Sequence, residues 1–397
     1  MICVMDKTSI IYLDNSATTR PSDASLKKMR EALSVCYGNP GSVHAMGNDA
    51  HKMLENARQS IGLSLGVRRP SDGHIIFTSS GSEANNLAVF GSVFAKDRPV
   101  KGTSKGKILI SDSEHPSVEK PCAGLEKEGF EVLRVPTAGG ELDLDFIRQR
   151  CDQSCILASF MLVNNETGAV YNVAEAARLV RAAAPKAFIH CDCVQAYMKM
   201  RFTPKSLGID ALTVSAHKIN APKGAGALFI TADVITGKRL VPVTLGGGQE
   251  MGFRSGTENT PAICAFGEAA TEGMRQMGER IERVRSLRAA LENELPQEVR
   301  INRPVNGYDG IVNLTLPMIK SETMLNYLSG EGICISAGSA CSARGGAISS
   351  VLQAFGLPKE EADCSVRVSI SHLNTEEEIN IFSKALKTGI KRLARIK

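Results

Sequence analysis

The 397-residue sequence lacks a long hydrophobic run. A helix needs roughly 20 consecutive apolar residues to cross a bilayer, and the longest apolar run here covers only about residues 155–163. Residues 1–11 also lack the basic start and the long apolar stretch of a secretion signal. We therefore expect a soluble, cytoplasmic protein with no membrane partner.

Paired cysteine clusters with zinc spacing are also missing. The eleven cysteines are an odd number, and most lie inside apolar segments, as small buried side chains do in a reducing compartment. Cys191 and Cys193 form a C-x-C without a second pair, so we interpret them as structural and expect no metal. No G-x-G-x-x-G follows the first predicted strand, which argues against a dinucleotide-binding dehydrogenase.

Concentrated charge of one sign is absent as well. The net charge is +5, and the densest basic cluster, 387–397, lies on a helical pattern that a solvated helix face explains. We expect no direct nucleic-acid partner. With 43% apolar and 22% charged residues the composition is typical of a globular protein, and the length favours two packed cores.

The middle of the chain alternates β-rich runs with amphipathic stretches. Strict alternation predicts βαβ units, hence an α/β fold with a large, mostly parallel sheet that binds ligands at the carboxyl ends of its strands. Strands are predicted at 74–78, 107–110, 131–135, 155–163, 187–192, 211–215 and 225–230, with helices at 82–96, 117–128 and 173–184.

The pattern changes after residue 248. A long helix is predicted at 259–295, followed by strands near 310–315, 332–336 and 365–370 and helices near 322–328 and 375–395. These elements predict a smaller α+β domain. We expect a large domain of residues 17–260 and a small domain of residues 1–16 plus 261–397, with the long helix bridging them.

Three segments combine polar residues with strand ends. Lys218 follows a predicted strand among small residues and glycines, where a partly desolvated amine suits Schiff-base chemistry, although alone it also fits a surface lysine in a turn. Residues 77–86 pass from strand through Gly81 to a helix, which makes either an anion site or a plain N-cap by Ser82. Asp192 ends an apolar strand and needs a buried partner, either a structural cation or a protonated ring nitrogen.

An ordered series of motifs connects these signals. Residues 12–19 (YLDNSATT), 38–44 (GNPGSVH), 114–115 (EH), 163–168 (VNNETG), 216–218 (AHK) and 254–257 (RSGT) occur in this order. The series resembles the cysteine desulfurases, which are class V, fold-type I enzymes dependent on pyridoxal 5'-phosphate (PLP). The resemblance covers residues 12 to about 379. Ala216 and Ala221 depart from the glycines usual at those positions, which bears on rate more than on reaction type.

The resemblance implies a role for each matching residue. It makes Lys218 the Schiff-base lysine, Asp192 the partner of the pyridine nitrogen, and His115 a ring-stacking proton shuttle. Gln195 would bond the phenolic oxygen, and a homodimer would complete the phosphate site. The remaining implied residues are Gly81, Ser82, Ser215 and His217 at the phosphate, Thr257 from the second subunit, and Asn165, Asn39 and Arg367 at the substrate, with Asn165 also near the cofactor.

The decisive segment for the reaction type is 336–346, SAGSACSARGG. Its small, polar residues suit a loop that presents the Cys341 thiol as a nucleophile, and it resembles the extended loop of desulfurases that pass sulfur to iron–sulfur scaffold or tRNA-thiolation proteins. The predicted activity is removal of sulfur from L-cysteine, giving alanine and a persulfide on Cys341. The alternatives are a selenocysteine lyase, another class V aminotransferase-like enzyme, or a non-catalytic sulfur-transfer scaffold.

Overall fold

A seven-stranded sheet forms the centre of the larger part of the molecule. The computed structural model describes residues 10–95, 105–338 and 348–393. Parallel pairs join β7, β6, β5, β3 and β4, whereas β8 runs antiparallel to both β2 and β7. Across the sheet the order is β2 (His74–Thr78), β8 (Gly226–Ile230), β7 (Ala211–Ser215), β6 (Phe188–Asp192), β5 (Cys155–Met161), β3 (Lys107–Ser111) and β4 (Glu131–Val135).

The antiparallel strand β8 corrects the expectation of strict strand–helix alternation. Between β7 and β8 lies a short connection with a single 3-10 turn, η4 (Ala216–Lys218). A parallel crossover needs a dozen or more residues, so the chain must turn back antiparallel here. The sheet is still mostly parallel, as predicted.

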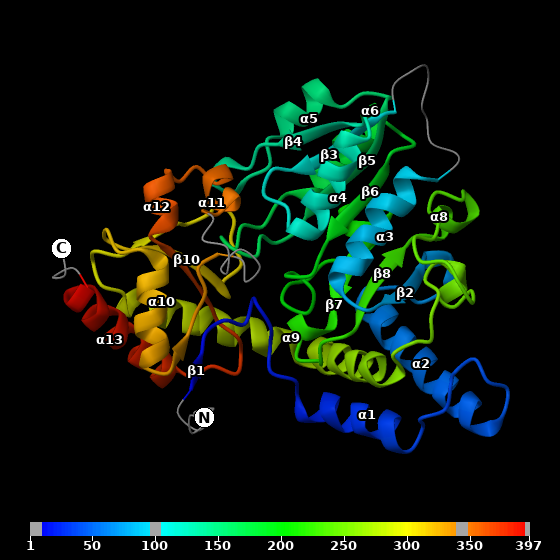
Figure 1. Cartoon of the computed structure of the whole chain (residues 1–397), viewed down its shortest axis with the longest axis horizontal. Helices are drawn as coiled ribbons and strands as arrows, with labels where there is room; N and C mark the ends of the chain where they lie inside the picture. Colours follow the sequence, from blue (N-terminus) through cyan, green and yellow to red (C-terminus); the bar gives the residue numbers. More distant parts are fainter. Residues whose placement is uncertain (1–9, 96–104, 339–347, 394–397) are drawn as a thin grey trace.

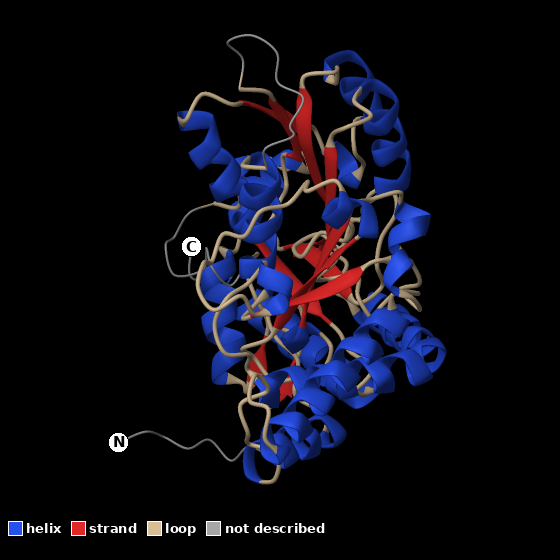
Figure 2. Ribbon diagram, turned by 90° about the vertical axis from the view of Figure 1, so that its right-hand side faces the viewer, coloured by secondary structure: helices blue, strands red, loops and turns tan. Residues whose placement is uncertain are grey.

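Helices cover both faces of the large sheet (Figure 2). Successive side chains of a strand point to opposite faces, and in β2 Phe77 belongs to one core while Ile76 belongs to the other. The first core packs against α2 (Ala45–Ser64), α5 (Leu144–Arg150), α6 (Val173–Ala183), α7 (Pro204–Leu207) and the beginning of α9 (Thr260–Glu294); the second packs against α3 (Gly81–Val93), α4 (Pro116–Lys127) and α8 (Ala232–Thr236).

A separate core lies between the smaller sheets and their helices. It is built from apolar residues such as Leu314, Val366 and Phe382. One sheet is antiparallel, in the order β12 (Ser365–Ser369), β10 (Ile311–Thr315), β9 (Arg300–Ile301); β1 (Ile11–Tyr12) pairs in parallel with β11 (Ile333–Cys334). The helices of this part are α10 (Ser321–Gly330), α11 (Ser350–Ala354), α12 (Lys359–Asp363) and α13 (Glu376–Leu393).

The helix α9 runs along both parts of the molecule (Figure 1). Near its start Phe266 is buried in the core of the large sheet, and near its end Leu287 and Leu291 are buried in the smaller core. Helices α1 (Asp23–Ser34) and α2 pack along its first part. We propose the same two-domain division, 17–260 and 1–16 plus 261–397, with α9 shared between them.

Several elements differ from the sequence expectations. Helices α1 and α2 were not predicted, and the strand expected at 332–336 is reduced to the two residues of β11. The strand expected at 155–163 ends at Met161, and Val163 forms an isolated bridge with Val170 instead. Within the described ranges, no helix combines the length and apolar character needed to span a membrane.

Candidate active site

The carboxyl ends of the parallel strands meet at one cavity of about 240 Å³. Chain segments that follow β3, β5, β6 and β7 all contribute side chains there, as expected for a mostly parallel sheet. Ten of the thirteen predicted site residues line it: Gly81, Ser82, His115, Asn165, Asp192, Gln195, Ser215, His217, Lys218 and Arg367. The fold therefore gathers residues that are up to 286 positions apart, since 367 − 81 = 286.

Lys218 reaches the cavity from the 3-10 turn η4 after β7. Its Nζ donates to the carbonyl oxygens of Ser16 and Ala17, the second at 2.8 Å. These carbonyls belong to the N-terminal segment that enters from the smaller part of the molecule. Two backbone oxygens therefore hold the amine in the cavity.

Asp192 ends β6 and is buried beside two amide donors. Its Oδ1 accepts from the Val194 backbone N–H at 2.9 Å, and its Oδ2 accepts from Asn85 Nδ2 at 2.7 Å. The same Asn85 nitrogen donates to Ser117 Oγ at 2.8 Å. The expectation that Asp192 would have a partner is met by amides, so its negative charge is available to a cationic ring nitrogen.

Hydrogen bonds assign the tautomer of His115, which caps the N-terminus of α4. The Ser117 backbone N–H donates to His115 Nδ1 at 3.1 Å, and Ser117 Oγ lies 2.7 Å from the same nitrogen. Because Nδ1 accepts, the proton of the neutral ring is on Nε2. Burial lowers the pKa of His115, as does the Lys218 cation, while Asp192 raises it. The ring is thus neutral with Nε2–H at neutral pH.

The phosphate end of the expected site lies at the N-terminus of α3. Gly81 and Ser82 are its first residues, and the N-cap is Ser80, whose side chain accepts from the Glu83 backbone N–H at 3.2 Å. This corrects the interpretation of Ser82 as the cap and leaves Ser82 in the cavity wall. A Cβ at Gly81 would lie 3.0 Å from Val194 Cγ2, so the close packing there favours glycine.

His217 also lines the cavity. Burial first, then the charges of Lys218, Lys223 and Lys199, lower its pKa to about 3. Its Nδ1 lies 3.2 Å from Thr18 Oγ1. The neutral imidazole can therefore act as a hydrogen-bond donor to an anion without adding charge.

Arg367 lies in β12 with 1% of its surface exposed. Its guanidinium donates to the Asn165 carbonyl oxygen at 2.8 Å and to Asp14 Oδ1 at 2.8 Å. Its Nε is buried and has no hydrogen-bond partner among the described residues. These contacts fix the guanidinium at the cavity and leave donors for an incoming carboxylate.

Cys341 lies outside the described residues, but the chain on either side is anchored at this site. Ser336 exchanges backbone hydrogen bonds with Arg367 at 3.1 and 2.6 Å. On the far side, Ser349 Oγ donates to Glu166 Oε2 at 2.6 Å, and Glu166 follows the cavity residue Asn165. The described residues on either side, Ser336 and Ser349, are therefore both bonded to residues at or next to the cavity.

Two predicted residues are not among those that line the cavity of this chain. Asn39 and Thr257 are both exposed. Asn39 Oδ1 accepts from the Gly41 backbone N–H at 2.9 Å, which makes a local turn.

The structure adds polar residues to the site to which the sequence motifs assigned no role. Asn85 and Ser117 connect Asp192 with His115, and Glu114 is buried nearby, where it accepts from Ser111 Oγ and the Met161 backbone N–H. Burial raises the pKa of Glu114 to about 8, and Asp192 adds to this, while hydrogen bonds from Ser111 and Met161 oppose it. Among the described residues, no group of three or more His, Cys, Asp or Glu side chains could hold a metal ion.

Unpaired polar atoms show that the cavity can take a polar group with both donors and acceptors. Ser215 Oγ, Asn85 Oδ1 and Arg367 Nε are buried without a hydrogen-bond partner in the described part of the chain, and all three residues line the cavity. Buried polar groups are normally paired. An amine at Lys218, a carboxylate at Asp192 and donors near the start of α3 are the complement of PLP, so the residues present fit this cofactor.

Known proteins match the chain over almost its whole length. The family model for aminotransferase class-V matches residues 11–382. Cysteine desulfurase 2 of Trichormus variabilis is 36% identical over 98% of this chain and 95% of its own length. Cysteine desulfurase IscS 1 of Archaeoglobus fulgidus is 35% identical over 96% of this chain and 97% of its own.

Solved structures agree with these relatives. A NifS-like protein is 32% identical, with a TM-score of 0.86 over 97% of this chain and 99% of the other. SspA, solved in complex with cysteine, is 29% identical, with a TM-score of 0.77 over 92% of this chain and 99% of the other. Sequence, fold and site geometry agree, and the chain belongs to the class-V aminotransferase family, among its cysteine desulfurases.

Proposed function

We propose that this protein is a PLP-dependent cysteine desulfurase that converts L-cysteine to L-alanine and places the sulfur on Cys341. The observation that carries the proposal is one cavity that joins Lys218, Asp192, His115 and Arg367. Relatives named cysteine desulfurase, and a related structure with cysteine bound, support the substrate.

Different residues would bind different groups of the cofactor. Bound PLP would supply an electron-withdrawing ring for the substrate carbon that bears the amino group. Lys218 would hold it covalently through Nζ, Asp192 would keep its ring nitrogen protonated, and Gln195 would donate to its phenolic oxygen. The phosphate would be held by Gly81, Ser82, Ser215 and His217 of this chain, and by Thr257 of a second copy.

Substrate orientation and proton transfer fall to other side chains. Arg367 would bind the carboxylate of cysteine as a fork, with Asn165, whose carbonyl oxygen accepts from this guanidinium, beside it. His115 has its proton on Nε2 and is neutral, so it can give a proton from that atom and take one back. Asn39 would assist substrate binding.

The sulfur-transfer step requires a thiolate on Cys341. The thiolate attacks the substrate sulfur, and a new S–S bond forms while the Cβ–S bond breaks. The electron pair of the broken bond goes to Cβ of the substrate, and protonation of this carbon gives alanine. The enzyme thiol thus becomes a persulfide, with no external oxidant required. An acceptor protein, an iron–sulfur scaffold or a tRNA-thiolation enzyme, would then take the sulfur.

The deciding experiment is mass spectrometry of the protein after brief exposure to cysteine. A mass increase of one sulfur on Cys341, found after digestion, is the expected result, and Cys341→Ala should carry none and release almost no alanine. Cys364→Ala, which removes a cysteine outside the cavity, is the matched control and should retain both. Sulfur on another cysteine, or normal alanine release by Cys341→Ala, would favour a different class V reaction.

The dimer has its own test. Thr257 is exposed in this chain and is absent from its cavity, which agrees with a role in a second copy's site. Sedimentation at assay concentration should give a dimer. A fully active monomer would exclude this role of Thr257.

A further inference from the structure

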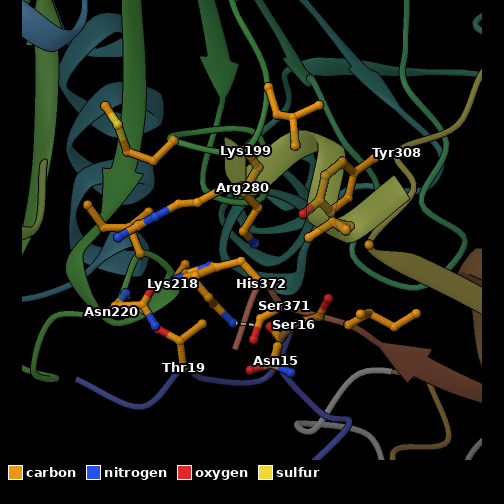
Figure 3. A pocket seen from close by; sticks show the side chains of 16 residues that line it. Asn15, Ser16, Thr19, Lys199, Lys218, Asn220, Arg280, Tyr308, Ser371 and His372 are labelled. Carbon is orange, nitrogen blue, oxygen red and sulfur yellow. Dashed lines mark hydrogen bonds between the residues drawn. The ribbon is translucent and has the colours of Figure 1, made fainter. Parts of the chain in front are cut away.

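Lys199 lies in the turn after β6, next to the proposed cofactor site. Its Nζ is 2.8 Å from Gln195 Oε1 and 6.0 Å from the centre of the Tyr308 ring. Figure 3 shows Lys199 and Lys218 pointing into the same small pocket from different parts of the chain, with Ser16 close to Lys218. Ser16 and Lys218 also line the larger cavity described above, so the two spaces are adjacent.

The contact with Lys199 determines which end of the Gln195 amide faces the cavity. An ammonium group has three donors and no acceptor, so it must meet the amide oxygen. The amide nitrogen then lies on the other side, where Nε2 donates to the Ser16 carbonyl oxygen at 2.9 Å. The same carbonyl accepts from Lys218 Nζ. A chain of hydrogen bonds thus runs from Lys199 through Gln195 and Ser16 to Lys218.

We propose that Lys199 is a positioning residue that holds the Gln195 amide with its nitrogen toward the cofactor. The proposal rests on the proposed function, because it assigns Gln195 as the donor to the phenolic oxygen of PLP. A glutamine amide can rotate by half a turn with little change of shape. Without Lys199, the amide oxygen could face the phenolic oxygen, and two acceptors would then oppose each other.

The surroundings of Lys199 are cationic. Its pKa is lowered to about 7 by burial first and then by the charges of Lys218 and Arg367. Arg280 from α9 also lines the small pocket and is paired with Glu272 at 3.4 Å, whereas His372 there is neutral because burial first, and then the charge of Arg280, lower its pKa to about 4. Positive charge on several sides favours an anionic oxygen beside Gln195. Lys199 therefore supports the phenolate by orienting the amide.

The measurement is the pH titration of the visible absorbance of bound PLP in the purified holoenzyme. A donor near the phenolic oxygen stabilises its anionic form and would favour loss of the proton that titrates with this absorbance. Lys199→Met should therefore raise the titration midpoint by roughly one pH unit. Lys199→Arg keeps a cationic donor and should restore most of the wild-type midpoint, and Lys205→Met, at an exposed lysine of α7, should leave it unchanged.

A double-mutant cycle separates positioning from charge. Gln195→Met should raise the midpoint as Lys199→Met does, and the double variant should show no further rise, since both remove the same donor. Additive shifts, or a wild-type midpoint in Lys199→Met, would overturn the proposal. If Lys199→Met folds by circular dichroism but holds no PLP, equal loss in Gln195→Met supports the proposal, and retention by Gln195→Met refutes it.

Failure of the underlying function gives a different result. If PLP does not bind at Lys218, wild-type protein and Lys218→Ala will have the same spectrum after incubation with the cofactor. If PLP binds but Lys199 has no positioning role, the wild type will have a visible band absent from Lys218→Ala, and the titration midpoint of Lys199→Met will equal that of the wild type.

Discussion

Removal of the Arg367 side chain tests the substrate end of the site most directly. The guanidinium is 1% exposed, and its contacts with Asp14 and the Asn165 carbonyl hold it in place before substrate arrives. Little conformational entropy is therefore lost on binding. Two hydrogen bonds to a carboxylate give a net effect of about 2–4 kcal/mol, so Arg367→Ala should lower kcat/KM for cysteine by roughly 30- to 1000-fold.

The loss should fall mainly on substrate binding. Alanine release, measured over a range of cysteine concentrations, should show a raised KM with a smaller change in kcat. Arg367→Lys keeps the charge but not the fork and should recover only part of the activity. Arg285→Ala, at an arginine whose side chain is 60% exposed, is the matched control and should behave as wild type. A folded Arg367→Ala protein with wild-type kcat/KM would refute the clamp.

Two further predictions concern stability. Glu250, with 1% of its side chain exposed, accepts two hydrogen bonds from Arg58 at 2.7 and 2.8 Å. Glu250→Gln should therefore lower the free energy of unfolding in urea by about 2–3 kcal/mol, against less than about 0.5 kcal/mol for Glu282→Gln in an exposed pair. Burial lowers the pKa of His190 to about 4. Between about pH 6.5 and 4 the histidine is therefore protonated in the unfolded chain and neutral in the folded chain. The free energy of unfolding should fall by about 3 kcal/mol between pH 6.5 and 4, and by less in His190→Asn. His51→Asn, at an exposed histidine, is the control and should show the wild-type dependence of the unfolding free energy on pH. The same dependence in His190→Asn as in the wild type would contradict this.

The site residues that can be predicted from the sequence are those whose signal lies in the residues adjacent to them. Asp192 ends a run of buried strand residues and Lys218 follows another by three residues, and such a run indicates that the polar residues after it lie at the sheet edge. The strand positions were predicted for the same reason, since alternating or continuous apolar residues bounded by glycine mark a buried strand.

The residues that were missed depend on contacts made only after folding. Asn85 and Asp192 are 107 positions apart, and nothing local to Asn85 indicates that its amide will join a carboxylate to a serine. The proposed role of Lys199 similarly depends on its contact with Gln195, whose amide in turn donates to the distant Ser16. These contacts depend on how β6 and the N-terminal segment pack against each other in the folded chain. A short sequence motif contains no information about that packing.

The helices that were missed have a different explanation. In α1 only Ser25 and Ala32 are buried. The helix therefore lacks the strong apolar stripe by which a core-facing helix is identified in a sequence. It is stabilised by packing on α9, which the sequence places more than 200 residues later. The antiparallel β8 was predicted as a strand, but its direction follows from the short connection after Lys218.

The shared helix α9 has a consequence for how the chain can be divided. Its 35 residues extend about 50 Å at 1.5 Å per residue, with Phe266 buried at one end and Leu291 at the other. A fragment that ends inside α9 would leave an uncovered apolar strip on one core and deprive the other of its packing partner. Neither half can thus be expressed or exchanged alone without a new helix to replace the missing part. The two cores should melt in a single cooperative transition, and their separation would require redesign of one long helix.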